Sequence, residues 1–327
     1  MKLKDRLILL DVGHGNCAVL VDAKGVVVID AGPKSGLLEF LAEQKIKRLN
    51  VVLLSHADKD HISGLLALLA AKTVAVDRIY VNTDSLKTSQ LWDDLLYELD
   101  AAKKAGRIDF DVSLVEDRSG KYDQGNVRIE ILAPSAYLAG RGPGSKDRKR
   151  RKLESNSVSA VVRLVLGNRP VVLLPGDIDD VGLANMIEGG GDARAPILVF
   201  PHHGGKACRD MPRFVRTLLG LTQAETVLFS VTRGEAKHPD PAVIAAVRAC
   251  SAAVRVACTQ ISEHCARSVP GGKPQHLAPI FARGRESNAC CAGSFVIELD
   301  GSNKLLPEAG AHGKFVKQSA PTALCRK

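Results

Sequence analysis

The chain has 327 residues, 45% of them hydrophobic, and 45 Lys and Arg against 36 Asp and Glu give a net charge of +9. Such a composition is typical of a globular protein with a sizeable core. No apolar run reaches membrane length, and residues 1–11 are too short and charged for a signal peptide, so we expect a cytoplasmic protein without a membrane partner. The aromatic content of 4% provides few platforms for stacking single-stranded bases.

Two aspartates end apolar strands in the first third of the chain. Neither Asp11 nor Asp30 has a neighbouring His with which to share a metal ion, so we expect both to be structural. Asp30 would hydrogen-bond the backbone of the loop 55–61 and orient its residues. The turn Gly13–Gly15 lacks the Lys and Ser/Thr of a phosphate loop; we favour a turn residue for His14, although it could also face the cleft.

The loop after the next apolar strand carries four metal-binding side chains within six residues. They are His56, Asp58, Asp60 and His61. Imidazole nitrogens and carboxylate oxygens are ligands of zinc, manganese and iron. A polar turn that caps the following helix is the alternative, but a cap needs only one or two such residues. The loop therefore predicts a metal site.

Three later strands lead to further polar residues at their carboxyl ends. The runs 171–174, 197–200 and 227–231 precede Asp177, the pair His202 and His203, and His238, respectively. Continuous apolar runs of this length are typical of strands buried on both faces. We expect their ends to meet the loop 55–61 in one shared site.

Helices are expected between the strands, over 36–47, 62–71, 91–104 and 241–250. Alternation of strands and helices favours a layered α/β fold. Taken in order, the motifs resemble the metallo-β-lactamase fold superfamily, whose signature is H-x-H-x-D-H after a strand, then a strand-borne Asp and a further His. Within it the chain is most similar to the competence type, the hydrolase domain of the DNA-uptake protein ComEC and its stand-alone relatives. The resemblance covers about residues 5–245 and implies a four-layer αββα sandwich.

The resemblance also implies roles for the matched residues. The metal ligands would be His56 and Asp58 for one ion, Asp60 and His61 for a second, Asp177 as the bridge, and one of His202 and His203. We favour His202, because it follows its strand directly. Asp58 replaces the second His of the signature, so the site is richer in oxygen and accepts zinc or manganese. Asp60 and His238 would take part in catalysis, His238 as a general acid or a phosphate contact; a surface loop His is the alternative.

A basic loop over 139–157 is the main source of local charge. Its core, 146–152, holds six positive charges and one negative. Arg148, Lys149, Arg150 and Arg151 could grip phosphates, or the loop could be a solvated insertion that aids solubility. In the competence type an Asn and a Ser precede the next strand; Asn156 and Ser159 match loosely and would line the pocket or order the loop.

The last third contains Cys250, Cys258, Cys265, Cys290 and Cys291 among its cysteines. A structural zinc site from Cys258, Cys265 and one of the last two, with His264, is one interpretation. The spacing lacks paired C-x-x-C motifs, so buried thiols are favoured. We expect a hydrolase domain over 1–270, a strand extension over 271–310 that packs on it, and a flexible tail over 311–327.

Together these features predict a hydrolase that uses two divalent metal ions, zinc or manganese, and a metal-bound hydroxide. Its substrate would be a phosphodiester in nucleic acid or a nucleotide. One alternative is a hydrolase of small esters, thioesters or lactones on the same fold. Another is a non-catalytic nucleic-acid-binding regulatory module. A protein partner encoded in the same operon could redirect the activity.

Overall fold

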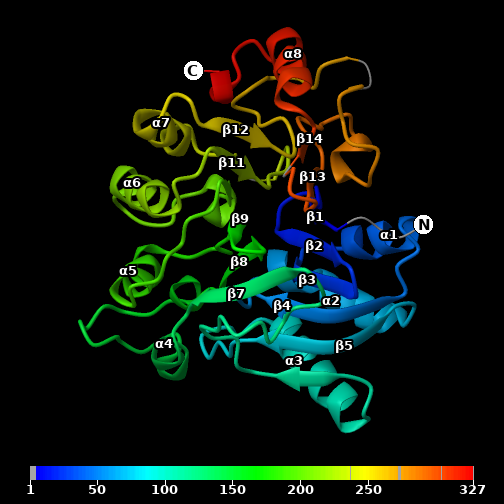
Figure 1. Cartoon of the computed structure of the whole chain (residues 1–327), viewed down its shortest axis with the longest axis vertical. Coiled ribbons are helices and arrows are strands. Elements are labelled where there is room, and N and C mark those ends of the chain that lie inside the picture. The colour runs from blue at the N-terminus through cyan, green and yellow to red at the C-terminus, as the bar shows by residue number, and fades with distance from the viewer. Residues whose placement is uncertain (1–4, 236, 272–273, 303, 327) are drawn as a thin grey trace.

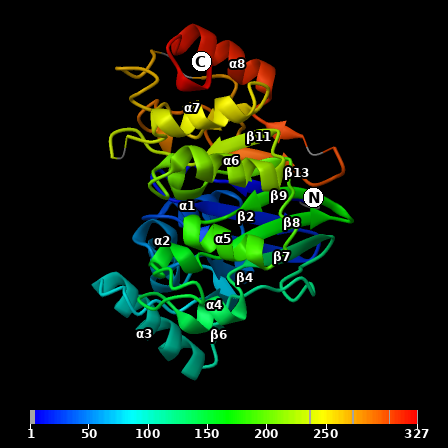
Figure 2. The same cartoon turned by 90° about the vertical axis from the view of Figure 1, so that its left-hand side faces the viewer.

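The computed structural model describes residues 5–235, 237–271, 274–302 and 304–326. Two β-sheets lie face to face between two layers of helices (Figures 1 and 2), which is the αββα sandwich that the sequence predicts. The expected domain ranges also include residues 1–4, 236, 272–273, 303 and 327, which lie outside the described part of the chain.

The first sheet has eight strands in the order β14-β13-β1-β2-β3-β4-β5-β6. Its strands are β1 (Arg6–Leu9), β2 (Cys17–Asp22), β3 (Gly25–Ala31), β4 (Arg48–Leu54), β5 (Ala75–Val81), β6 (Asp109–Asp111), β13 (Phe295–Glu298) and β14 (Leu305–Leu306). Strands β3 to β6 are parallel to one another. The helices α1 (Gly36–Glu43), α2 (Lys59–Ala71) and α3 (Gln90–Lys104) pack on its outer face.

The second sheet has six strands in the order β12-β11-β10-β9-β8-β7. Its strands are β7 (Val127–Ala133), β8 (Val161–Leu166), β9 (Arg169–Leu174), β10 (Ile197–Val199), β11 (Thr226–Phe229) and β12 (Arg255–Cys258). Strands β9 to β12 are parallel. The helices α4 (Ala136–Arg141), α5 (Asp180–Glu188), α6 (Met211–Thr222) and α7 (Pro241–Cys250) lie on its outer side, facing the viewer in Figure 2.

Three apolar layers hold the four structural layers together. Side chains alternate along a strand between the two faces of its sheet. In β4, Val52 and Leu54 pack against the helices, whereas Val51 and Leu53 pack against the second sheet. Both faces of the central strands are therefore buried, which explains their nearly continuous apolar sequence.

The segment 311–327, which we expected to be a flexible tail, contains helical structure over much of its length. The helix α8 spans Ala309–Ser319, and a 3-10 turn, η4, spans Leu324–Arg326. His312 and Val316 are buried, at 4% and 3% exposure. They are four residues apart and so lie on one helix face, a period hidden by the Lys, Gly and Ser residues around them.

A buried ion pair braces the outer face of the second sheet. Arg163 of β8 lies opposite Glu130 of β7, with Nη2 at 2.6 Å from Oε2, and Asp192 is 3.2 Å from Nη1. Arg163 and Glu130 are 4% and 7% exposed. Removing one partner leaves a buried charge without its main compensation.

We expect Glu130→Ala to lower the free energy of unfolding by about 3–5 kcal/mol, measured by urea denaturation. The exposed pair of Arg48 with Asp77 is the control. Arg48→Ala should cost less than about 1 kcal/mol, because water screens an exposed pair. An equal loss of unfolding free energy in the two variants would show that burial does not strengthen the contribution of the Glu130–Arg163 pair to stability.

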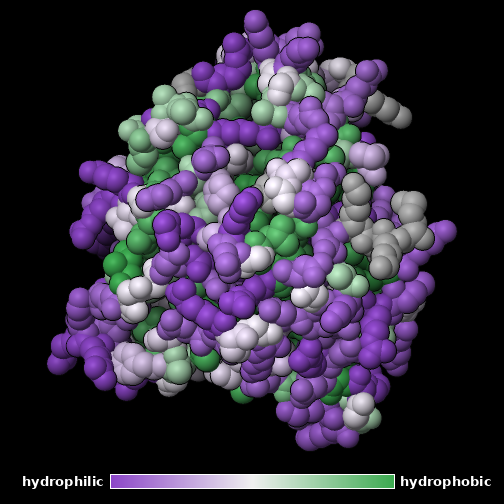
Figure 3. Space-filling model, viewed as in Figure 1, coloured by the Kyte–Doolittle hydropathy of each residue, from purple (hydrophilic) through white to green (hydrophobic). Residues whose placement is uncertain are grey.

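In the described ranges, no helix is long and apolar enough to cross a membrane. The face shown in Figure 3 is largely hydrophilic, and its hydrophobic side chains form small separate patches. This surface fits an interior in which the apolar residues are already covered by the helices.

Candidate metal centre

The carboxyl ends of the parallel strands of both sheets supply the polar loops of the site. The loop after β4 leads into α2, the loop after β9 leads to α5, and a 3-10 turn, η2 (Pro201–Gly204), follows β10. Loops at this end of a parallel sheet are the usual place for ligands. Their side chains meet where the two sheets face each other.

Four side chains from these loops form one compact group. The group consists of Asp60, His61, Asp177 and His203, whose potential ligand atoms all lie within 4.8 Å of one another. His203 Nε2 is 3.0 Å from Asp60 Oδ2, and His61 Nε2 is 3.4 Å from Asp177 Oδ1. We call these four residues the His/Asp cluster.

A second half of the site lies on the other side of Asp177. His56 Nε2 is 3.6 Å from Asp58 Oδ2 and 4.0 Å from Asp177 Oδ2. Asp58 occupies the N-cap position of α2, yet its side chain makes no capping hydrogen bond. Helix capping therefore does not explain the Asp at position 58. Asp177 lies between this pair and the His/Asp cluster, and it contacts both His56 and His61.

The hydrogen bonding of the imidazoles fits a metal centre. His61 Nδ1 contacts Asp30 Oδ2 at 2.7 Å, and His56 Nδ1 contacts Ser55 Oγ at 3.0 Å. The Nε2 atoms of both rings are buried without a well-formed hydrogen bond. A buried polar atom without a partner is costly, and a His whose Nδ1 is held by a carboxylate presents Nε2 to a metal. Mixed imidazole and carboxylate donors suit zinc, manganese or iron.

The acidic residues of the site are held in their charged form. Burial opposes ionisation of Asp177, but His61 and His203 hold its pKa well below the ordinary value. Burial likewise opposes ionisation of Asp58, but the contacts with His56 and Lys87 lower its pKa to about 2. The site therefore concentrates negative charge that a divalent cation would balance.

Residues 10–207, more than half of the chain, match the family model of the metallo-beta-lactamase superfamily. The chain belongs to this superfamily. With the His/Asp cluster, this membership identifies a metal-dependent hydrolase of the metallo-β-lactamase fold.

Relatives of this metallo-β-lactamase-fold chain are distant. It is 24% identical over 245 residues to the competence protein ComA of Neisseria gonorrhoeae. The match spans 73% of this chain but only 29% of the length of ComA. Igni18, a metallo hydrolase from Ignicoccus hospitalis, has a TM-score of 0.47 and 14% identity over 79% of this chain and 97% of its own. YhfI of Bacillus subtilis, a metallo-beta-lactamase fold protein, has a TM-score of 0.46 and 12% identity over 80% of this chain and 98% of its own.

The structure brings His203 into the His/Asp cluster, and not His202, which we favoured from the sequence. Both residues have left-handed backbones, with φ of 55° and 53°. The turn sends His203 inward, where it is 3% exposed and its Nδ1 contacts the Ser230 carbonyl oxygen at 3.0 Å. His202 is 34% exposed, and both its backbone N–H and its Nδ1 contact Asp177 at 3.0 Å.

His14 lies at the site, which was the less favoured of our two interpretations of this residue. Its Nε2 is 3.6 Å from Asp60 Oδ2, and its ring stacks with that of His238 at 5.7 Å. A Cβ at Gly15 would lie 2.3 Å from the Asp60 carbonyl oxygen, so this close approach needs glycine. The flanking glycines were the signal that could have revealed His14.

His238, which we expected near the cleft, lies beside the His/Asp cluster. Burial and the neighbouring His14 and His203 lower its pKa to about 4. Burial, together with His203, also lowers the pKa of His14. Two imidazoles whose pKa values are lowered therefore lie beside the cluster, with His14 next to Asp60 and His238 stacked on His14.

Sequence reasoning missed Lys87, which follows β5. Its ammonium group forms an ion pair with Asp58, and both side chains are 27% exposed. A lone Lys in a loop carries no signal of such a role. The pair places a positive charge at the rim of the centre.

Asp30 and Asp11 have different roles. Asp30 accepts hydrogen bonds from the backbone N–H and the hydroxyl of Ser55, at 2.7 and 2.8 Å, and also holds His61. Asp11 instead accepts from Gln260 at 2.8 Å and from the Gly284 N–H at 2.9 Å, so it ties the first loop to the last third of the chain.

We expect Asp30→Asn to reduce kcat/KM by about 10- to 100-fold, because the amide no longer orients His61 as a carboxylate does. The variant should also bind metal more weakly, measured by titration with zinc or manganese. Asp77→Asn, at an exposed pair far from these loops in the sequence, is the control. Unchanged metal affinity in Asp30→Asn would contradict the orienting role.

Ser159 and Asn156 order the loop that supports Asp177. Ser159 is 1% exposed, and its Oγ accepts the N–H of Asp177 at 3.0 Å. The Asn156 carbonyl oxygen accepts the Ser159 N–H at 3.2 Å. Burial keeps Ser159 from lining a substrate pocket, so the loop-ordering interpretation fits it better.

The charges of the basic loop 139–157 are partly compensated within the fold. Lys149 and Arg151 form ion pairs with Glu188, and Arg151 also pairs with Asp147 at 2.6 Å. Arg148 lies over the Tyr137 ring at 5.2 Å, and Arg150 is exposed. None of the four has a hydrogen bond or ion pair to the His/Asp cluster in the described structure.

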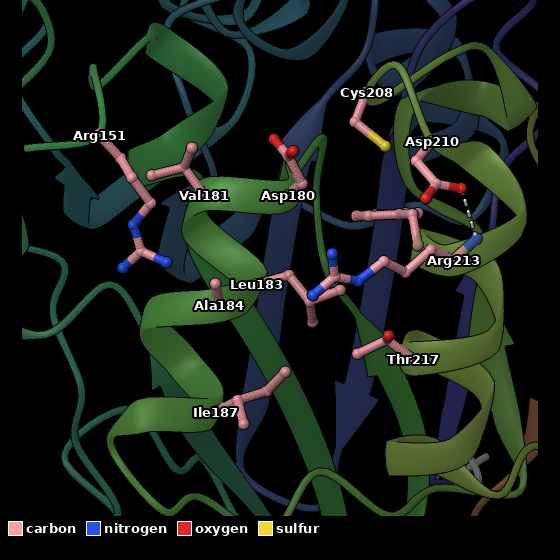
Figure 4. A pocket seen from close by; sticks show the side chains of 11 residues that line it. Arg151, Asp180, Val181, Leu183, Ala184, Ile187, Cys208, Asp210, Arg213 and Thr217 are labelled. Atoms are coloured by element: carbon pink, nitrogen blue, oxygen red, sulfur yellow. Dashed lines mark hydrogen bonds between the residues drawn. The ribbon is translucent and has the colours of Figure 1, made fainter. Parts of the chain in front are cut away.

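Arg151 lines a groove of about 270 Å³ between α5 and α6. Figure 4 shows Leu183 of α5 and Thr217 of α6 pointing toward one another across it, with Arg213 beside them. The lining includes no residue of the His/Asp cluster. The groove is thus separate from the metal centre.

Proposed function

We propose that this chain is a phosphodiesterase that acts on nucleic acid or a nucleotide with two divalent metal ions, zinc or manganese. The observation that carries the proposal is Lys87 beside Asp58. A positive side chain at the rim of a metal centre favours an anionic substrate, since it can contact a phosphoryl oxygen directly. The similarity to a competence protein and the net charge of +9 agree with such a substrate.

The two halves of the site would hold the two ions. Asp60, His61 and His203 form one half, His56 and Asp58 the other, and Asp177 faces both. When bound, such ions supply Lewis acidity toward water and toward the phosphoryl oxygens.

The surrounding residues would position the substrate and handle protons. Lys87 would turn from Asp58 toward a phosphoryl oxygen, and Asp30 would keep His61 in place. The buried Nδ1 of His238 lacks a hydrogen-bond partner. As a neutral imidazole, His238 would donate a hydrogen bond from an N–H to the leaving oxygen, and His14 stacks on its ring.

The exposed part of the basic loop is the proposed contact for a polymer. Arg148 and Arg150 have no ion pair in the described structure, in contrast with Lys149 and Arg151. They would add a salt-dependent contribution to binding of a long nucleic acid, but not of a small phosphodiester.

The first test is hydrolysis by metal-stripped protein reloaded with manganese or zinc. The substrates are bis-p-nitrophenyl phosphate, single- and double-stranded DNA, p-nitrophenyl acetate, a thioester and a lactone. We expect metal-dependent cleavage of the phosphodiesters above that of the esters. Cleavage of esters alone would assign the site to small-molecule hydrolysis, and DNA binding without any turnover would assign a regulatory module.

We expect Lys87→Ala to raise KM for bis-p-nitrophenyl phosphate by about 10-fold, because a hydrogen bond to a charged group contributes about 1.5–3 kcal/mol. Hydrolysis of a neutral ester should change little. Lys104→Ala, which removes a surface Lys paired with Asp100, is the control. Metal content is measured in parallel, since Asp58 loses its partner. An equal effect on both substrate types would contradict a phosphate contact.

A further inference from the structure

Four cysteines from separate segments line one enclosed apolar pocket. They are Cys258 at the end of β12, Cys265 in the loop after it, Cys291 before β13, and Cys325 in η4. The pocket has a volume of about 10 Å³, roughly one water molecule. It lies in the upper part of Figure 1, where α7, β12 and the C-terminal segment meet. Four of the eight thiols of the chain therefore share one small space.

Hydrogen bonds to backbone carbonyl oxygens hold the four segments in place. The Ala292 N–H donates to the Cys258 carbonyl oxygen at 2.9 Å, which joins the segments of Cys258 and Cys291. Thr322 Oγ1 donates to the Cys265 carbonyl oxygen at 2.9 Å. Arg248 donates to the carbonyl oxygen of Cys325. Hydrogen bonds from the rest of the fold therefore hold all the segments that carry the four cysteines.

An imidazole adjoins the thiols. His312 Nε2 is 3.2 Å from Cys291 Sγ, and His312 is 4% exposed. A cation bound among four thiolates would balance their negative charge.

We propose that Cys258, Cys265, Cys291 and Cys325 bind one structural zinc ion as thiolates, with His312 holding the sulfur of Cys291. Four sulfur ligands in a closed, water-poor pocket are the preferred structural site of zinc. Soft thiolates also select zinc over the harder ions that carboxylates accept. The His/Asp cluster and this thiol pocket therefore call for different coordination chemistry.

The ligand set differs from the one that sequence spacing suggested. Cys290 is turned toward Asp11, with Sγ at 3.8 Å from Oδ2, and neither Cys290 nor His264 lines the pocket. Cys325, near the end of the described chain, is the fourth thiol of the pocket. In the described residues no three of the four sulfur atoms lie within 4.8 Å of one another, so zinc binding would draw the four sulfur atoms closer together.

Zinc at this position would brace both ends of the last third of the chain. His312 belongs to α8, and η4 carries Cys325. Pro239 also lines the pocket, directly after His238 of the metal centre. The ion would fix α8 and η4 to the second sheet and would support the loop that carries His238.

The test is metal analysis of the whole chain purified under reducing conditions. In Asp60→Ala/His203→Ala, which removes two ligands of the catalytic centre, we expect one zinc per chain to survive dialysis against EDTA. Cys291→Ser in that background should lose it, and the control Cys250→Ser, at an exposed thiol outside this pocket, should keep it. Cobalt substitution of the double variant should produce the sulfur-to-cobalt charge-transfer absorption, and Cys291→Ser should abolish it.

Failure of this proposal is separable from failure of the proposed function, because every variant already lacks two ligands of the catalytic centre. Cys325→Ser, in the terminal turn, is the second variant if Cys291→Ser does not fold. Absence of zinc and of the cobalt band in the double variant would overturn the site. So would EDTA-resistant zinc that persists in both serine variants, or mass spectra that show the four cysteines joined as disulfides.

Discussion

Asp177→Ala is expected to reduce phosphodiester hydrolysis by about 10³-fold or more, since loss of a metal ligand removes several kcal/mol of transition-state stabilisation. Asp177 is the one carboxylate of the site that faces both halves, at 3.4 Å from His61 and 4.0 Å from His56. Its loss would weaken both ions together. The measurements are kcat/KM for bis-p-nitrophenyl phosphate and metal content after dialysis.

Asp180→Ala is the matched control, because Asp180 is an exposed Asp that lies three residues further on and lines the separate groove between α5 and α6. It should keep both activity and metal. Circular dichroism checks that Asp177→Ala is folded. Retention of more than about a tenth of the activity with normal metal content would exclude Asp177 as a bridging ligand.

His203→Ala is expected to reduce kcat/KM by about 10²- to 10³-fold, and His202→Ala by about 10-fold. His203 belongs to the His/Asp cluster and contacts Asp60 at 3.0 Å. His202 is more exposed and contacts Asp177 as a neighbour. Its loss would therefore disturb the orientation of Asp177 but remove no ligand from the cluster.

Metal affinity distinguishes the two imidazoles more directly than activity does. His203→Ala should bind fewer ions at a fixed free metal concentration, and His202→Ala should bind the normal number. Zinc and manganese titrations followed by calorimetry measure this. The reverse order of effects would restore the preference that the sequence suggested.

The local sequence was sufficient to predict the class of fold and the chemistry of the centre. The loop that contains His56, Asp58, Asp60 and His61 needs no distant information, because it directly follows a strand and all four side chains are of types that bind metal ions. Apolar runs that end in Asp177 or in a His pair similarly reveal parallel strands. The observed helix α2 begins at Lys59, earlier than the expected Ile62, so Asp60 and His61 lie in its first turn.

Which residues complete the site was decided by backbone geometry. Adjacent His residues are equivalent in sequence, and the left-handed turn at His202 and His203 makes only one of them face Asp60. Lys87 reaches Asp58 because β5 is the parallel neighbour of β4, which brings the two loops together. Which side chains reach the site depends on turn conformation and on strand order, and neither can be inferred from the neighbouring residues in the sequence.

The sequence by itself determined the layered α/β architecture, the His and Asp ligand chemistry and the basic character of the chain. The tertiary structure decided that His203 rather than His202 joins the His/Asp cluster, and it decided the place of His14, the burial of α8 and the meeting of Cys325 with three distant cysteines. The physical reason is the range of the forces involved. Hydrophobic periodicity and ligand type act over a few residues, whereas packing joins segments hundreds of residues apart.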